Sequence, residues 1–210
     1  MLENIISNLK KERDGTKAWA RMAVRNSDGE IEKIQKYNEW FSDKKKNTLK
    51  KASVLIALFN HRNELAFPVI KRPLHEKNHP GQIALPGGSQ EQNETLEITA
   101  KREAYEEMGI NPDETKIIGE LTPLPVPVSG YLIHPYIGIL DKEPKWKICK
   151  KEVDEFFIVK VSELIDSNNG YYETWNMKDK KLDVPIFKIN NQTIWGATAS
   201  VLSEFIELTK

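Results

Sequence analysis

Residues 87–110 read GGSQEQNETLEITAKREAYEEMGI, and they contain the clearest local signals in the chain. The part from Thr95 to Met108 has neither glycine nor proline and is rich in glutamate and alanine, which predicts a helix. Gly109 stands where glycine commonly ends a helix. Before the helix, Gly87 and Gly88 allow the backbone to come close to a ligand or a metal ion. The stretch therefore predicts a glycine-rich loop that leads into a helix.

Three glutamates share one face of this predicted helix. Glu103, Glu106 and Glu107 have the spacing i, i+3 and i+4, so their carboxylates lie within one turn. Like charges at this spacing destabilise a helix by roughly a few tenths of a kcal/mol per pair, and a solvated acidic face is their usual fate. Three hard oxygen donors on one turn also suit Mg²⁺ or Mn²⁺, with waters and substrate phosphates completing the coordination. Taken alone, the three residues leave both interpretations open.

The spacing of the whole stretch resembles the Nudix box at every specified position. The matching residues are Gly88, Glu94, Arg102, Glu103, Ala104, Glu106, Glu107, Gly109 and Ile110. The resemblance implies a divalent-metal site in an α/β/α sandwich with a mixed central sheet, and hydrolysis of a nucleoside diphosphate linked to another group. It implies that Glu103 and Glu107 are the principal ligands of Mg²⁺ or Mn²⁺. Glu106 is expected to be a third ligand or to position the water, and the Gly88 carbonyl to join the ligands.

Other residues of the box are expected to support the site without touching the metal. By the same resemblance, Arg102 pairs with Glu94 and braces the loop against the helix. Gly87 and Gly109 belong with them as structural residues. The catalytic candidates are therefore the three glutamates of one helical turn.

The segment before the box resembles the one that marks coenzyme A pyrophosphatases within the Nudix family. It contains Lys71-Arg72 and then residues 79–88, which read HPGQIALPGG. The family pattern has a small residue, usually an arginine and usually a phenylalanine where this chain has Pro73, Lys77 and Leu85. The resemblance implies a substrate of the coenzyme A or acyl-coenzyme A type, cleaved to 3′,5′-ADP and 4′-phosphopantetheine or its acylated form. The candidate substrate-binding residues are Lys71, Arg72, Lys77, His79 and Gln82.

Two other functions stay open at this stage. The three departures from the coenzyme A pattern favour the same chemistry on ADP-ribose, another nucleoside diphosphate derivative or a noncanonical nucleotide. A Nudix-fold module that senses a nucleotide without turnover is the third hypothesis. The intact acidic positions of the box favour an enzyme over such a module.

Outside the box, strand-like segments outnumber helical ones and do not alternate with them, which predicts an α+β fold. The predicted strands are residues 53–59, 65–70, 82–85, 116–121, 132–140, 155–160, 171–175 and 184–189. The predicted helices besides the box helix are residues 2–9, 31–41, 161–166 and the C-terminal stretch through Phe205. Residues 1–50 form an N-terminal helical extension and residues 51–210 the catalytic domain. The apolar stripe of the first helix is too short to be stable alone, so it is expected to dock on its own domain or on a second copy in a homodimer.

Composition excludes several classes of function. The chain has 210 residues, with 31 Lys and Arg against 31 Asp and Glu, so its net charge is about zero. A nucleic-acid binder would normally carry a basic excess. No apolar run approaches the roughly 20 residues that span a bilayer, which argues against a membrane partner. The N-terminus shows no signal peptide, and the single Cys149 cannot form an internal disulfide. A reducing, cytoplasmic setting is the natural interpretation.

One further segment is ambiguous. Residues 142–151 contain five lysines and Trp146. We interpret this segment as a solvated loop, with a substrate-facing loop as the alternative.

Overall fold

The computed structural model describes residues 1–31, 46–76, 79–177 and 180–210. The helix predicted for residues 31–41 lies outside these ranges apart from Ile31, and so does the candidate Lys77. The helices are α1 (Leu2–Leu9), α2 (Thr16–Arg21), α5 (Leu96–Met108), α6 (Val161–Ile165) and α7 (Gly196–Glu207). Two short 3₁₀ turns, η1 (Pro112–Glu114) and η2 (Ser167–Asn169), complete the helical elements of the described residues.

A mixed eight-stranded sheet forms the centre of the fold. Its strands are β1 (Lys50–His61), β2 (Glu64–Lys71), β3 (Ile83–Ala84), β4 (Gly87–Ser89), β5 (Lys116–Glu120), β6 (Leu124–Val126), β7 (Tyr131–Ile139) and β8 (Glu155–Lys160). The main order is β3-β2-β1-β7-β5, while β4 pairs with β1, β6 with β7 and β8 with β2. Strands β1 and β7 run parallel, and the other pairs are antiparallel. A separate antiparallel sheet contains β9 (Gly170–Met177), β10 (Lys180–Ile189) and β11 (Gln192–Ile194).

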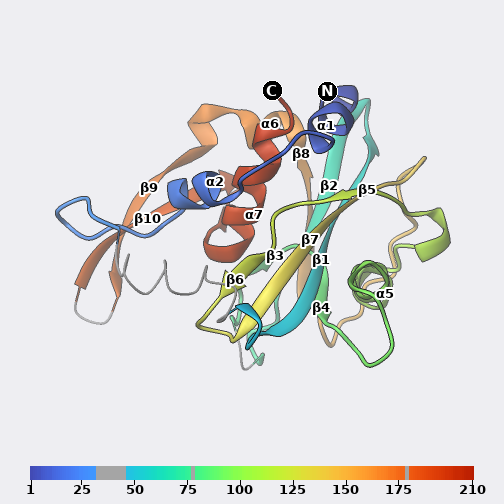
Figure 1. The fold of residues 1–210 in the computed structure, drawn as a ribbon, viewed down its shortest axis with the longest axis horizontal. Coiled ribbons are helices and arrows are strands. Elements are labelled where there is room, and N and C mark those ends of the chain that lie inside the picture. Colours follow the sequence, from blue (N-terminus) through green and yellow to red (C-terminus); the bar gives the residue numbers. More distant parts are fainter. Residues whose placement is uncertain (32–45, 77–78, 178–179) are drawn as a thin grey trace.

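Helices cover both faces of the large sheet. Figure 1 shows α5 on one side of the sheet and α7 with α2 on the other. Strand β1 is buried on both faces, because Leu55 and Phe59 belong to the apolar cluster that includes α5, whereas Ile56 and Leu58 belong to the cluster that includes α7. A strand between two layers must be apolar at successive positions, which explains its unbroken apolar run. The predicted α+β sandwich with a mixed central sheet is confirmed.

Strand β4 differs from the sequence prediction. Pro86-Gly87-Gly88 was expected to end an extended segment, but Gly87 and Gly88 pair with Val54 and Ser53 of β1. Gly87 has φ +155, and a Cβ there would lie 2.2 Å from the Ser53 carbonyl oxygen. Only glycine permits this approach, so the two glycines extend the sheet up to the start of the box.

The described part of the N-terminal extension packs on the same core as the sheet. Ile5 of α1 and Trp19 of α2 are buried in the cluster on the α7 side. Helix α2 was not among the helices predicted from the sequence. Six residues form a stable helix here because Trp19 is buried against the core, rather than because of intrinsic propensity. Of the two docking options for α1, the structure has the one on its own chain.

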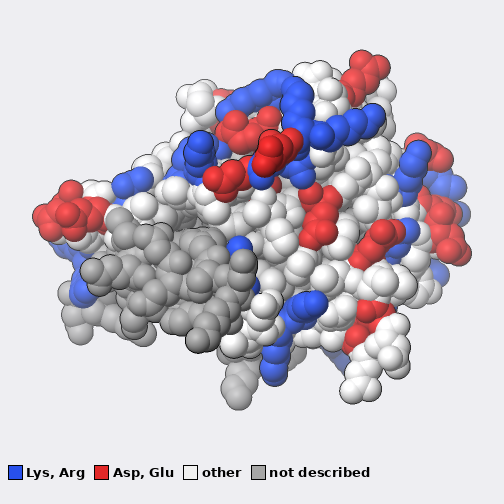
Figure 2. All heavy atoms as spheres, in the orientation of Figure 1, with Lys and Arg blue, Asp and Glu red and all other residues white. Residues whose placement is uncertain are grey.

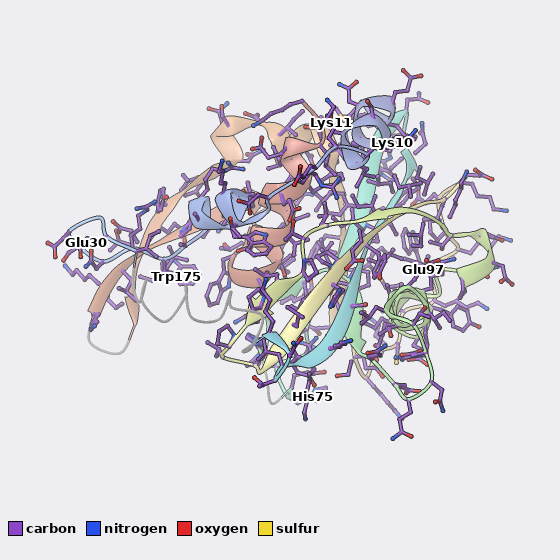
Figure 3. The ribbon with its side chains drawn as sticks, viewed as in Figure 1. Lys10, Lys11, Glu30, His75, Glu97 and Trp175 are labelled. Atoms are coloured by element: carbon purple, nitrogen blue, oxygen red, sulfur yellow. The ribbon has the colours of Figure 1, made fainter. Side chains whose placement is uncertain are left out.

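Hydrogen bonds from side chains to main-chain carbonyls attach this extension to strand β5 and to helix α7. Arg13 Nη2 donates to the Glu120 carbonyl at 2.8 Å, and Ser203 Oγ of α7 donates to the Ala18 carbonyl at 2.9 Å. In Figure 3, Lys10 and Lys11 lie at the opposite end of the molecule from His75. The end of α1 is therefore distant from the loop that follows β2.

Deleting residues 1–10 should lower the melting temperature without changing the oligomeric state. The deletion removes Ile5, whose full burial contributes about 1.5–3 kcal/mol. For a chain of this size, that loss corresponds to a decrease of about 3–12 °C. Thermal unfolding and size-exclusion chromatography measure both quantities. An unchanged melting curve would mean that α1 contributes nothing to the fold.

The surface is mixed in charge. On the face shown in Figure 2, Lys and Arg side chains lie among Asp and Glu side chains. This distribution agrees with the balanced composition. Among the described residues, no helix combines the length and the apolar character that crossing a membrane requires.

Candidate active site

Helix α5 begins and ends at residues suited to those positions. Thr95 is the N-cap, and its side chain accepts a hydrogen bond from the Ile98 amide at 3.2 Å. Gly109 is the C-cap in the left-handed conformation, with φ +76. The helix predicted from Thr95 to Met108 is confirmed to within one residue. These two caps fix the turn that carries the glutamates.

Three carboxylates converge beside the glycine-rich strand β4. Glu103 and Glu107 of α5 and Glu152 of the segment before β8 each offer an oxygen, and these oxygens lie within 4.8 Å of one another. We call these three residues the carboxylate cluster. Glu107 Oε2 also accepts a hydrogen bond of 3.0 Å from the Gly87 amide. A set of oxygen donors of this size fits a hard divalent cation such as Mg²⁺ or Mn²⁺.

Burial makes this cluster electrostatically unfavourable without a cation. Glu107 is 3% exposed, and its burial raises the pKa of its carboxyl to about 8. Burial also raises the pKa of Glu103, although the neighbouring Arg102 acts in the opposite direction. Carboxylates that must lose their protons in a buried position are stabilised by a bound cation. The raised pKa values of Glu103 and Glu107 therefore agree with a divalent cation held by the carboxylate oxygens.

Gly88 and Glu106 occupy different places relative to the cluster. A Cβ at Gly88 would lie 2.5 Å from the Glu103 carboxyl carbon, so the glycine lies directly against this ligand candidate. Glu106 was expected beside Glu103 and Glu107, but its side chain is 49% exposed and accepts a hydrogen bond of 2.9 Å from Arg102. In the described residues it is not one of the three converging carboxylates.

Arg102 and Glu94 form the expected brace between loop and helix. Arg102 donates to both carboxylate oxygens of Glu94, at 3.1 Å from Nε and 3.0 Å from Nη2. The same guanidinium donates to Glu103 at 2.9 Å and to the Ser89 carbonyl at 3.1 Å. Arg102 thus connects strand β4, the loop and the cluster through one side chain.

The Glu94 carboxyl gives the fold a specific acid dependence. The bond from Arg102 lowers its pKa from 4.5 to about 2. A carboxyl whose pKa is lowered by folding adds stability that is complete above about pH 4.5 and is lost as the pH falls toward 2.

We expect Glu94→Gln to be less stable than the parent at neutral pH, and the difference to shrink with acidification. Urea unfolding at several pH values measures the free energy of unfolding of both proteins. A difference that does not change with pH would contradict a lowered pKa for Glu94.

The substrate-binding candidates before the box differ in their partners. The Lys71 ammonium bonds Glu155 at 3.0 Å and lies 3.7 Å from Asp154. Arg72 Nη2 bonds Glu76 at 2.6 Å, and the Arg72 charge acts against the rise in the pKa of Glu107 that burial causes. Of the two basic residues, Arg72 therefore has the closer electrostatic connection to the cluster.

His79 and Gln82 shape the loop between β2 and β3. His79 has φ +56, and the Gln82 amide donates to its carbonyl at 3.3 Å. The Gln82 carbonyl in turn accepts a bond of 3.0 Å from the Arg72 amide. These backbone contacts fix the shape of the loop that follows Arg72.

Glu152 is the site residue that sequence analysis missed. It directly follows the lysine-rich segment 142–151, which drew attention for its charge, and it precedes a stretch, residues 153–155, that resembles the family's pattern. The lysines of the segment are exposed, as a solvated loop requires. Its backbone, however, is bonded to the end of α5, since the Cys149 amide donates to the Glu107 carbonyl at 2.9 Å. That long-range bond carries no local sequence signal.

A shallow hollow lies where the end of α5 meets residues 147–149. It has a volume of about 330 Å³ and is lined by Tyr105, Glu106, Gly109, Lys147, Ile148 and Cys149. None of the three residues of the carboxylate cluster lines it.

Comparisons with known proteins agree with this arrangement. The sequence profile of the NUDIX domain matches residues 49–179. A protein of Enterobacter sp. (strain 638), named uncharacterized Nudix hydrolase NudL, is 30% identical over 156 residues, which are 74% of this chain and 80% of the relative. The protein of the same name from Pectobacterium atrosepticum is 28% identical over the same shares. The crystal structure of a MutT/nudix family protein from Enterococcus faecalis matches 95% of this chain and 76% of its own, with a TM-score of 0.54 and 12% identity, which shows a shared fold.

Proposed function

Because the chain belongs to the Nudix hydrolase family, we propose that it hydrolyses the diphosphate bond of coenzyme A or acyl-coenzyme A. The products would be 3′,5′-ADP and 4′-phosphopantetheine or its acylated form. Family membership itself makes the chain a hydrolase that acts on nucleoside diphosphate derivatives. The observation that carries the proposal is the convergence of Glu103, Glu107 and Glu152, which each offer an oxygen within 4.8 Å of the others.

In this proposal the carboxylate cluster holds Mg²⁺ or Mn²⁺, with the Gly88 carbonyl as a further ligand. A divalent cation supplies charge neutralisation for the diphosphate and lowers the pKa of a bound water. Glu106 would position the attacking water or join the ligands. Glu94 and Arg102 hold the loop and helix so that the three carboxylates stay together.

The coenzyme A branch is supported by the residues before the box. Coenzyme A carries a 3′-phosphate in addition to its diphosphate, so a basic residue beside the cluster is useful to it. We favour Arg72 for this contact because its charge acts on Glu107 of the cluster. The Arg72 guanidinium and the Lys71 ammonium are each already bonded to a glutamate, Glu76 and Glu155 respectively. His79 and Gln82 support the same loop and are proposed as further substrate contacts. The single cysteine favours a cytoplasmic setting for this substrate.

Coenzyme A should be a better substrate than dephospho-coenzyme A if Arg72 binds the 3′-phosphate. One charge-assisted contact supports a preference in kcat/KM of about tenfold to a hundredfold. Arg72→Ala should remove most of this preference, whereas Lys71→Ala, which removes a side chain already bonded to Glu155, should retain it. Initial rates on both substrates measure the effect. Equal rates in the parent would remove the argument for a 3′-phosphate contact.

ADP-ribose or another nucleoside diphosphate derivative is the second candidate substrate. Pro73 and Leu85, which differ from the coenzyme A pattern, favour it. The two candidates share the carboxylate cluster, so only a comparison of substrates separates them. A panel of coenzyme A, an acyl-coenzyme A, dephospho-coenzyme A, ADP-ribose and nucleoside triphosphates with Mg²⁺ or Mn²⁺ provides it. A clear preference for ADP-ribose would replace the coenzyme A assignment.

A further inference from the structure

Glu152 depends on its backbone for its place in the cluster. The side chain is exposed, and among the described residues it has no hydrogen-bonding side chain as a partner. Its amide donates to the Cys149 carbonyl at 3.0 Å, and the Cys149 amide donates to the Glu107 carbonyl at 2.9 Å. The Lys147 amide donates to the Met108 carbonyl at 2.9 Å. The segment that carries Glu152 is therefore attached to the last turn of α5 by its main chain.

Trp146 anchors this segment immediately before those bonds. Its ring packs against Phe59 of β1, with centroids 5.6 Å apart, and against Phe156 of β8, at 5.1 Å. Its indole Nε1 donates to Glu143 Oε1 at 3.2 Å. Glu143 Oε2 lies 2.8 Å from His61 Nδ1, at the end of β1. The aromatic contacts and the Glu143 bridge thus hold the segment to two strands of the central sheet.

Gly109 adds a steric constraint at the same point. A Cβ at Gly109 would lie 2.7 Å from the Cβ of Lys147, the residue after Trp146. The end of α5 and the segment are therefore in direct contact at Lys147. A shift of the indole would be transmitted to the backbone between Lys147 and Glu152, because packed elements move together.

We infer that Trp146 is a positioning residue for the metal site, which it serves by holding Glu152 next to Glu103 and Glu107. The inference rests on the proposed function only in assigning a divalent cation to the carboxylate cluster. Trp146 does not touch the cluster and acts through the main chain of residues 147–152. A residue that supports a metal ligand in this way typically changes metal affinity by about tenfold to a hundredfold when it is replaced.

The test is a titration of the metal-free protein with Mn²⁺, in which electron paramagnetic resonance measures the free ion. Trp146→Leu should weaken Mn²⁺ binding by about tenfold or more, and Trp146→Phe, which keeps an aromatic ring, should recover most of the affinity. Phe205→Leu is the matched control, because Phe205 is fully buried against Phe67 on the other side of the sheet. It should lower the melting temperature and leave Mn²⁺ affinity unchanged. A purely structural role for Trp146 predicts the same result as this control, and that result would overturn the inference.

A double variant shows whether Trp146 acts through Glu152. In the background of Glu152→Gln, Trp146→Leu should cause little further loss of Mn²⁺ affinity, since both changes remove the same ligand. Independent, additive losses would overturn the inference. If Trp146→Leu does not fold, Glu143→Ala replaces it, because this partly exposed side chain bridges Trp146 and His61. It should weaken Mn²⁺ binding measurably, and parental affinity in this folded variant would also contradict the inference.

The outcomes separate this inference from the proposed function. A parent that binds Mn²⁺ through Glu152 and Trp146 but cleaves neither coenzyme A nor ADP-ribose would refute the function and support the inference. A parent that cleaves coenzyme A while Glu152→Gln binds Mn²⁺ normally would refute the inference alone.

Discussion

Replacing Glu107 by Gln is expected to lower kcat at saturating Mg²⁺ by at least about a hundredfold, because the loss of one strong transition-state stabiliser costs roughly 3 kcal/mol or more. The side chain keeps its size and can still accept the hydrogen bond from the Gly87 amide. Its buried carboxyl has a pKa of about 8, so a neutral amide is well tolerated in the metal-free fold. The melting temperature should therefore equal or slightly exceed that of the parent. Steady-state kinetics and thermal unfolding measure the two effects.

Glu97→Gln is the matched control for this change. Glu97 lies on the same helix, and its carboxylate contacts Lys101 at 3.7 Å with the side chain 49% exposed (Figure 3). The control makes the same chemical change outside the carboxylate cluster and should keep parental kcat. If Glu107→Gln retained near-parental turnover, the carboxylate cluster would not be the catalytic site.

Replacing Arg102 by Ala is expected to reduce stability and activity together. It leaves Glu94 without its main partner, at a position where the Glu94 side chain is only 11% exposed. Removing one partner of such a pair costs about 3–5 kcal/mol when burial is complete, so a loss of about 2–3 kcal/mol is expected here. For a chain of this size, that corresponds to a decrease in melting temperature of about 4–12 °C.

Arg21→Ala is the matched control for Arg102→Ala, because it removes an arginine from an ion pair outside the site. Arg21 pairs with Glu207 at 2.6 Å, but both side chains are largely exposed, at 50% and 40%. Exposed pairs contribute about 0–1 kcal/mol, so this control should shift the melting temperature by only a few degrees. Equal shifts for the two variants would show that Arg102 does not brace the site.

The box helix was predictable because its signals are local. Thr95 and Gly109 cap it, and the glutamate spacing depends only on helical geometry. The brace between Arg102 and Glu94 followed from the resemblance, and the structure contains it. In such a segment, composition and spacing determine both the element and the direction of its side chains.

Other features depend on contacts that sequence patterns do not show. Helix α2 has six residues and exists because Trp19 packs into the core. Strand β4 contains two glycines, which weaken a strand in isolation but are required here by the close approach to β1. Glu152 reaches the cluster only because the main chain of its segment is bonded to α5. Each case is a tertiary effect that overrides or adds to local preference.

Glu106 shows that residues of one motif can differ in burial. Its spacing puts it on the same helical face as the two cluster glutamates. Its side chain is 49% exposed, however, and accepts a hydrogen bond of 2.9 Å from Arg102. The third converging oxygen comes instead from a segment outside the box.

The most direct test of the account is the hydrolysis of coenzyme A before and after metal removal. The protein is first treated with EDTA, and product formation is then followed by chromatography during titration with Mg²⁺ or Mn²⁺. The account predicts negligible hydrolysis in EDTA and a metal-dependent rate afterwards, with 3′,5′-ADP and 4′-phosphopantetheine as the products. A rate unaffected by EDTA, or no cleavage of coenzyme A at any metal concentration, would contradict it.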